Sequence, residues 1–317
     1  MGKKVTVAAV HAAPVFMDKK GSIEKVLQLI KEGKDQEIEL LVFPETFIPG
    51  YPYFIHTHPP LKCVDAQAQY ADESVVVGRT GGDLLPIMHI CAELKIAVSI
   101  GISERVEGGH TLFNSQAFID TDGTLLGVHR KIQPTHAERT LWAQGSGHTL
   151  KVWPSSVGRI GGLACWGNAM NNARQALIED RQEIHAAAWA ALSTVSGFES
   201  VANIQIEALM KNHAFTAQWM EKNLGPQDLV KKGGGWSAVI HPFCTVLAGP
   251  HTGAEEKFLK AEINYDELGA VKVWIDASGH YKRPEILKLN VDRSPTWPDD
   301  EILASGASII PHDGVGS

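Results

Sequence analysis

The strongest constraint on the fold is an alternation of apolar, strand-like runs with amphipathic, helix-like segments, which two hairpins interrupt. Strands are predicted at residues 5–10, 39–43, 96–102, 112–119, 124–129, 159–164, 184–189, 237–240, 245–248 and 258–263. Helices are predicted at residues 22–34, with Ser22 as the cap, and at 83–95, 169–180, 201–218 and 266–271. Residues 120–123 and the region around Pro242 mark the hairpins. Because a purely parallel doubly wound sheet contains no hairpins, the pattern predicts an α/β fold with one mixed sheet or two stacked mixed sheets.

The chain is interpreted as one domain. Its 317 residues are enough for two small domains or one large α/β domain. No shift in composition and no flexible linker divides it, and the three glycines at 233–235 are interpreted as a loop. We therefore expect a single domain over residues 1–295 and a C-terminal tail, extended or poorly ordered, over residues 296–317.

Charge and composition argue against several classes of partner. A net charge of −7 leaves no basic excess to neutralise phosphates, so nucleic acid is not expected to bind. No apolar run reaches the ~20 residues of a membrane-spanning helix. The four cysteines are widely spaced and form no CxxC pair, as is typical of free thiols in a reducing compartment. A cytoplasmic location is the expectation.

Cys165 is a candidate nucleophile because of its position. It follows a predicted strand and precedes Trp166 and a predicted helix, whose N–H groups would stabilise a thiolate. A thiolate attacks carbon readily. The alternative is an ordinary small core residue, which is how Cys63, Cys91 and Cys244 are interpreted.

Two acids and one lysine stand near other predicted strand ends. Glu45 follows a strand at the edge where α/β sites form, and partial burial there would raise its pKa and suit it to proton transfer. A solvated loop glutamate is the alternative. Lys131 is placed either to stabilise a developing anion or simply to close a hairpin strand in solvent. Glu138 is a second acidic candidate, unless it pairs with Arg139.

Other motifs give little support to other chemistries. His56 and His58 resemble half of a metal site, but no acid or thiol stands at a matching spacing, so no metal is expected. The chain has no GxSxG, P-loop or GxGxxG motif. A serine-elbow hydrolase, an NTPase and a dinucleotide-binding enzyme are therefore not supported.

Three motifs together resemble the nitrilase superfamily. They are residues 43–52 (FPETFIPGYP), 129–139 (HRKIQPTHAER) and 162–166 (GLACW), in the order and spacing of that family. Trp166 after the cysteine, Tyr51 in the first motif, and the segment 183–189 ending at Trp189 are similar to the nitrilase branch rather than the amidase or carbamoylase branches. The resemblance covers about residues 5–293. It implies a four-layer α-β-β-α sandwich with Tyr51, Trp166 and Trp189 at the substrate site.

The resemblance also implies a mechanism that needs no cofactor. Glu45, Lys131 and Cys165 match the catalytic glutamate, lysine and cysteine of the family, and Glu138 matches its second glutamate. Such an enzyme hydrolyses a small-molecule nitrile to a carboxylic acid and ammonia through thioimidate and thioester intermediates. Its relatives self-associate into dimers or spiral filaments, so we expect the same here.

The chain departs from the family pattern at two points. Gly167 stands where the nitrilase branch usually has a glutamate after Cys-Trp. After Gln218 the family usually continues into a buried strand, but here a charged segment beginning at Trp219 follows at once. Two alternatives stay open: an amidase or cyanide-hydrating relative, and a weakly active relative that serves as a binding or scaffold protein.

Overall fold

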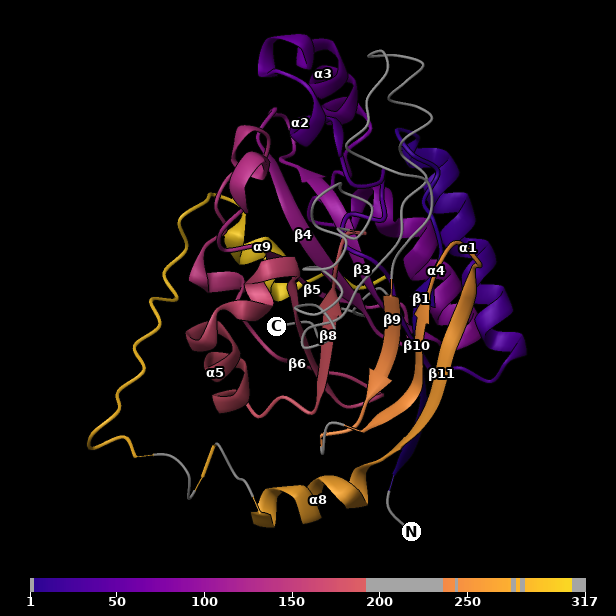
Figure 1. Cartoon of the computed structure of the whole chain (residues 1–317), viewed down its shortest axis with the longest axis vertical. Helices are drawn as coiled ribbons and strands as arrows, with labels where there is room; N and C mark the ends of the chain where they lie inside the picture. Colours follow the sequence, from indigo (N-terminus) through magenta and orange to yellow (C-terminus); the bar gives the residue numbers. More distant parts are fainter. Residues whose placement is uncertain (1–2, 192–235, 243–244, 275–277, 280–282, 310–317) are drawn as a thin grey trace, which may run out of the picture.

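The structure is a computed structural model that describes residues 3–191, 236–242, 245–274, 278–279 and 283–309 (Figure 1). The strands are β1 Lys4–His11, β2 Leu40–Val42, β3 Ala97–Arg105, β4 Leu112–Ile119, β5 Leu125–Arg130, β6 Trp153–Pro154, β7 Arg159–Ala164, β8 Ile184–Ala188, β9 Trp236–Ile240, β10 Val246–Thr252 and β11 Lys257–Asn264. The α-helices are α1 Lys19–Asp35, α2 Phe54–Thr57, α3 Val64–Asp72, α4 Leu85–Leu94, α5 Asn171–Glu179, α8 Tyr265–Trp274 and α9 Asp300–Ser305. Short 3-10 helices are η1 Pro60–Lys62, η2 Gly82–Leu84, η3 His136–Thr140, η4 Gly147–Thr149 and η5 Cys165–Ala169.

The strands form mixed sheets, as predicted. The largest has the order β11-β1-β2-β3-β4-β5, in which β1, β2 and β3 are parallel and the other pairings are antiparallel. A second sheet has the order β6-β7-β8, and β9 pairs with β10. The hairpin predicted at residues 120–123 joins β4 to β5, and Gly123 turns it with a φ of 82°.

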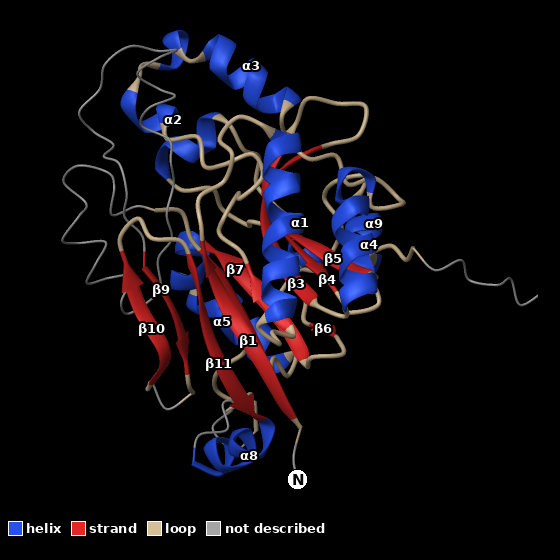
Figure 2. Cartoon of the chain, turned by 90° about the vertical axis from the view of Figure 1, so that its right-hand side faces the viewer, coloured by secondary structure: helices blue, strands red, loops and turns tan. Residues whose placement is uncertain are grey.

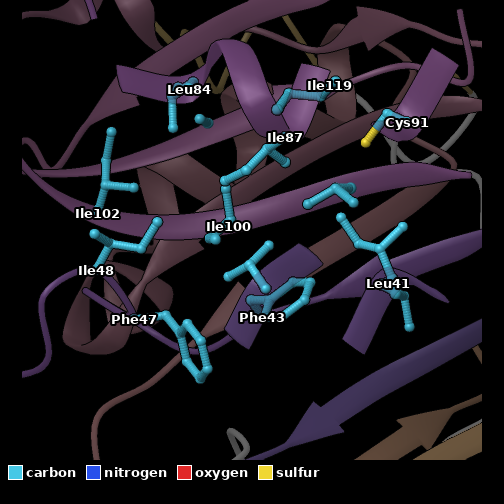
Figure 3. Close-up of a cluster of buried hydrophobic side chains, with 14 of the residues drawn as sticks. Leu41, Phe43, Phe47, Ile48, Leu84, Ile87, Cys91, Ile100, Ile102 and Ile119 are labelled. Carbon is cyan, nitrogen blue, oxygen red and sulfur yellow. The ribbon is translucent and has the colours of Figure 1, made fainter. Parts of the chain in front are cut away.

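Three apolar clusters separate four layers. The first lies between α1, α4 and the outer face of the six-stranded sheet and includes Ile30 on α1. Figure 3 labels two other members, Ile87 and Ile100. The second joins the inner face of that sheet to β6–β8, where Phe118 packs on Trp153 with ring centroids 4.8 Å apart. A third joins β7 to α5. Figure 2 shows α1 facing the viewer in front of the strands. The α-β-β-α sandwich expected from the resemblance is therefore confirmed.

Several predicted boundaries are wrong for local reasons. The first helix begins at Lys19, and Asp18 rather than Ser22 caps it by accepting from the Gly21 N–H. Ser22 is buried and donates instead to the Val15 carbonyl, inside the first turn. No helix was predicted between residues 43 and 83, but this stretch contains α2 and α3.

The C-terminal segment differs from its prediction. Residues 300–305 form α9, which packs beside β5, and Ala307 pairs with Leu125 in an isolated bridge. An extended or poorly ordered tail is therefore wrong for this part. Residues 310–317 and the helix predicted at 201–218, with the point after Gln218, lie outside the described residues.

A cavity of about 350 Å³ lies between β8 and β9, over β1 and β2. Among the described strands, β8 pairs only with β7, and β9 only with β10. Apolar side chains such as Val7, Leu40 and Val239 line most of the cavity. It reaches Pro44 and Trp189 but none of the four polar residues predicted to be catalytic, so it lies behind their site rather than in it.

Candidate functional site

The carboxyl ends of three strands bring the predicted residues together. Glu45 is the third residue after β2, Lys131 follows β5 directly, and Cys165 follows β7 directly. Because β5 runs parallel to β2 through two antiparallel pairings, both strands end at the same edge of their sheet. Side-chain oxygens of Glu45 and Glu138 and the Cys165 sulfur all lie within 4.8 Å of one another.

Glu45 is fully enclosed and has a partner for each oxygen. Its Oε1 accepts from Asn114 Nδ2 at 2.8 Å and from Lys131 Nζ at 2.9 Å. Its Oε2 accepts from the Ala190 N–H at 2.9 Å. Burial raises the pKa of Glu45, and the charge on Glu138 raises it further, although Lys131 and Asn114 oppose the shift. The predicted rise is confirmed, and a solvated loop position is excluded.

Lys131 bridges the two acids. Its Nζ donates to Glu45 Oε1 and, at 2.7 Å, to Glu138 Oε2. Burial alone would lower the pKa of Lys131, but the two carboxylates reverse this effect and raise the pKa above its usual value. In the resting site the side chain is therefore a buried, charged ammonium and not a solvated lysine closing a hairpin.

Glu138 is held in place by a capping box. The Thr135 N–H donates to Glu138 Oε2 at 2.8 Å at the start of η3. Tyr51 donates its hydroxyl proton to Glu138 Oε1 at 2.8 Å. Arg139 turns away and donates Nε to the Pro134 carbonyl, so the alternative of a Glu138–Arg139 ion pair is wrong. Adjacent residues on a helical turn do not face each other.

Cys165 occupies a strained backbone position. Its φ is 50°, in the left-handed region that costs a non-glycine residue about 1–3 kcal/mol. Asn168 braces this turn by donating Nδ2 to the carbonyls of Leu163, at 2.8 Å, and Cys165, at 2.9 Å. This braced turn holds the thiol at the strand end, close to the carboxylates of Glu45 and Glu138.

The thiol is held protonated. Burial, and next the negative charge of Glu45, raise the pKa of Cys165 well above its usual value. Lys131 and the Trp166 N–H act in the opposite direction but do not prevail. The Trp166 N–H thus acts in the expected direction, but burial and the charge of Glu45 outweigh it, and the short η5 rather than the predicted helix follows Cys165 directly. Attack by this sulfur requires a base to remove its proton.

The site is completed by residues that the sequence patterns did not indicate. Gly101 on β3 lets the Glu45 turn pass over it, because a Cβ there would lie 2.2 Å from the Pro44 carbonyl oxygen. Asn114 is a buried amide on β4. The run of three polar residues from Asn114 to Gln116, in the middle of a predicted strand, was the available signal for it. Thr135 was readable as the start of a Thr-x-x-Glu capping box.

The three residues predicted to line the substrate site lie next to the candidate catalytic residues: Trp166 adjoins Cys165, the Trp189 carbonyl accepts from the Glu45 N–H, and Tyr51 bonds to Glu138. Trp166 and Trp189 meet edge to face, with ring centroids 5.5 Å apart. The Trp189 indole N–H is buried and has no hydrogen-bond partner in the part of the chain that the structure describes. Tyr51 is buried and contacts Glu138. Gly167 has an ordinary φ, and a Cβ placed there would have only an ordinary 3.7 Å contact with Leu163.

Among the described residues, one group has the ligand atoms of a metal site, and that group belongs to the candidate active site. Glu45, Glu138 and Cys165 supply two carboxylates and a sulfur. The Lys131 ammonium bonds to both carboxylates, so a cation there would be repelled. His56 and His58 belong to no metal-ligand group in the described ranges. Across those ranges, no helix combines the length and apolar character needed to cross a bilayer.

Comparisons with known proteins agree with this arrangement. The carbon-nitrogen hydrolase family matches residues 6–273. Nitrilase 3 from an unknown prokaryotic organism is 34% identical over 98% of each chain, and an aliphatic nitrilase from Rhodococcus rhodochrous is 30% identical over 98% of this chain and 89% of its own. A carbon-nitrogen hydrolase from Helicobacter pylori G27 superposes with a TM-score of 0.66 at 19% identity, covering 90% of this chain and 98% of its own. The chain belongs to the carbon-nitrogen hydrolase family and is a hydrolase of carbon–nitrogen bonds other than peptide bonds.

Proposed function

We propose that this protein hydrolyses small-molecule nitriles to carboxylic acids and ammonia. The observation that carries the proposal is the Lys131 ammonium, which bridges two buried carboxylates beside the buried Cys165 thiol. Full-length similarity to proteins named as nitrilases supports the same substrate class.

The first step is attack by sulfur on the nitrile carbon. Glu45 takes the thiol proton, because its raised pKa makes it a stronger base than an exposed carboxylate. The raised pKa of Cys165 makes this transfer coincide with attack rather than precede it. The product is a thioimidate on Cys165, and its nitrogen has gained a proton.

The later steps use two water molecules. The first adds to the thioimidate, and Lys131 stabilises the tetrahedral species by its fixed positive charge in a site that excludes solvent. Ammonia leaves and a thioester remains. Glu45 then takes a proton from the second water, whose oxygen attacks the thioester. The product leaves as a carboxylate and its acid proton returns to the Cys165 sulfur, while Glu138 keeps Lys131 in place.

Two alternative functions are compatible with the same site. An amidase or cyanide-hydrating enzyme would use the same thiol, and a comparison of nitriles with amides as substrates separates it from a nitrile-hydrolysing enzyme. A scaffold protein with little activity has less support, because the strained Cys165 backbone and the buried ion pairs cost free energy that a binding surface does not require.

Ammonia release measured across aliphatic, aromatic and arylaceto-nitriles, and across the matching amides, tests the proposal. We expect turnover of at least one nitrile, with Cys165 alkylated by an electrophile and protected by that substrate. Turnover of amides without any nitrile would assign the chain to the amidases. Labelling of Cys165 without turnover of any substrate would favour the scaffold protein. A cytoplasmic location and self-association are further parts of the proposal.

A further inference from the structure

An unbroken series of hydrogen bonds joins the Glu45 carboxylate to a partly exposed histidine. Lys131 Nζ lies 2.9 Å from Glu45 Oε1 and 2.7 Å from Glu138 Oε2. Tyr51 Oη lies 2.8 Å from Glu138 Oε1 and 3.1 Å from His56 Nε2. The first four members are buried, whereas the His56 ring, on α2, is only partly covered.

The proposed reaction leaves a proton behind in this buried site. Written with the products as they leave, a nitrile and two waters give a carboxylate, ammonia and one proton. An amide and one water also give a carboxylate, ammonia and one proton. Glu45, as the base for the last water, is the group that holds this proton. Glu45 has to lose this proton before it can accept the proton of Cys165 again.

We propose that Glu138, Tyr51 and His56 form the route by which this proton leaves the enzyme in each turnover. The proposal rests on the proposed function, but only on the release of a carboxylate from a thioester, which nitrile and amide hydrolysis share.

Each transfer conserves protons. Lys131 first gives a proton to Glu138 Oε2, and the neutral amine so formed then takes the proton from Glu45 Oε1, so that Lys131 ends as an ammonium again. Rotation of the Glu138 carboxyl group presents that proton to Tyr51. The Tyr51 hydroxyl, whose proton is free to rotate, passes its own proton to His56 Nε2 and takes the one from Glu138. His56 releases a proton from Nδ1 to water.

The surroundings of His56 favour release. Burial lowers the pKa of His56, and the charge on Lys131 and the neighbouring His136 lower it further, while Glu138 opposes them. A histidine with a lowered pKa is neutral at neutral pH and gives up an added proton readily. The ring of Tyr51 stacks on the His56 ring with an interplanar angle of 9°, which keeps the two polar atoms together.

The test is kinetic and uses the full-length enzyme with its best nitrile or amide. His56→Ala interrupts the route at its outer end, and Tyr51→Phe interrupts it in the middle. His58→Ala is the matched control, because this histidine is also partly exposed on the same loop but bonds to Thr57. Each protein is assayed in a weakly buffered solution with and without added imidazole, after circular dichroism has shown equal folding.

We expect His56→Ala to lower kcat by roughly tenfold, less than the ~100-fold expected for loss of a positioned general base, because water can still remove the proton slowly. kcat/KM should stay nearly constant, since proton exit follows ammonia release. Imidazole should restore kcat of His56→Ala but not of Tyr51→Phe, and should leave His58→Ala unchanged.

Two results would overturn the route. One is a His56→Ala enzyme with wild-type kcat in weak buffer. The other is a kcat that falls together with kcat/KM and does not respond to imidazole, because that pattern indicates a purely structural role. Loss of the proposed function would look different: the wild-type enzyme would turn over amides only, and the imidazole experiment would still decide the route on that substrate.

Discussion

Asp299, in the C-terminal segment, pairs at 2.6 Å with the guanidinium of Arg130, the residue directly before Lys131. Arg130 is fully buried and also pairs with Glu104 on β3 and with Asp300. The Asp300 carboxylate accepts the N–H groups of Thr296 and Trp297 through its second oxygen. The C-terminal segment therefore neutralises a buried charge beside the candidate active site.

The ion pairs around Arg130 predict that Asp300→Ala destabilises the fold strongly. Removing one partner of a buried charge leaves that charge under-compensated, and we expect a loss of about 3 kcal/mol in the free energy of unfolding. Urea unfolding followed by fluorescence measures it. Glu301→Ala is the matched control, because this neighbour is exposed and its one ion pair among the residues that the structure describes is with His148, so its loss should cost less than about 0.5 kcal/mol. Equal losses for the two variants would contradict the prediction.

The nucleophile is predicted to be Cys165 and no other cysteine. Cys165→Ala should lower ammonia release by at least about 10³-fold, because the thiol acts as one unit with its base. Its unfolding midpoint should stay close to that of the wild type. Cys63→Ala and Cys91→Ala should remain active, since both thiols are buried in apolar clusters away from Glu45, and the same is expected of Cys244→Ala. An active Cys165→Ala enzyme would rule out the proposed mechanism.

The pH dependence should follow the ionisation of Glu45. Because burial and then the charge on Glu138 raise the pKa of Glu45, the base is lost as the pH falls through a value above that of an exposed glutamate. Glu138→Gln removes a negative charge and leaves Lys131 to Glu45 alone, so the acid limb of kcat/KM should move to lower pH. A rate profile from pH 4 to 9 on one substrate, roughly the range in which side-chain acids and histidines titrate, checks this. A limb that stays or moves upward would contradict it.

The sequence patterns predicted those features of the fold and the site that depend on local periodicity. The ends of β2, β5 and β7 follow from short apolar runs, and these ends place Glu45, Lys131 and Cys165. Capping was less predictable, because Asp18 and Ser22 both suit an N-cap and only the bond from Ser22 to Val15 decides between them.

Other features depend on contacts that no local window contains. Asp300 bonds to Arg130 from 170 residues away, so the order in the C-terminal segment was not visible in its own composition. The raised pKa of Cys165 results from burial, which the sequence did not reveal. Helix α3 was missed because it buries only Ala66 and Tyr70, too few apolar positions to show a clear period.

Self-association is a prediction that solution measurements can check. Leu61 and Val64 project into solvent at the start of α3, and Ile286 and Leu287 do so between α8 and α9. Contact with another copy would cover such side chains. We expect light scattering at micromolar concentration to show a homodimer or a larger assembly. A monomer under those conditions would contradict the prediction.

Gly167 is predicted to limit activity because of the side chain it lacks. The position directly follows Cys165-Trp166 in η5, and its backbone has an ordinary φ, so the turn does not require glycine. The strain in this turn falls on Cys165 instead, which makes extra backbone freedom next to it a disadvantage for positioning the thiol. A Cβ has room beside Leu163.

We therefore expect Gly167→Glu to raise turnover on at least one nitrile, or to change the ratio of acid to amide. Gly167→Ala separates the two causes, because it removes backbone freedom without adding a carboxylate. Acid, amide and ammonia are measured for all three proteins on one nitrile panel, with Cys165 alkylation as the check on access to the thiol. If the alanine variant alone reproduces the gain, backbone freedom is the cause; if only the glutamate variant does, the carboxylate is. Equal rates and equal product ratios for all three proteins would show that glycine at this position has no effect on the reaction.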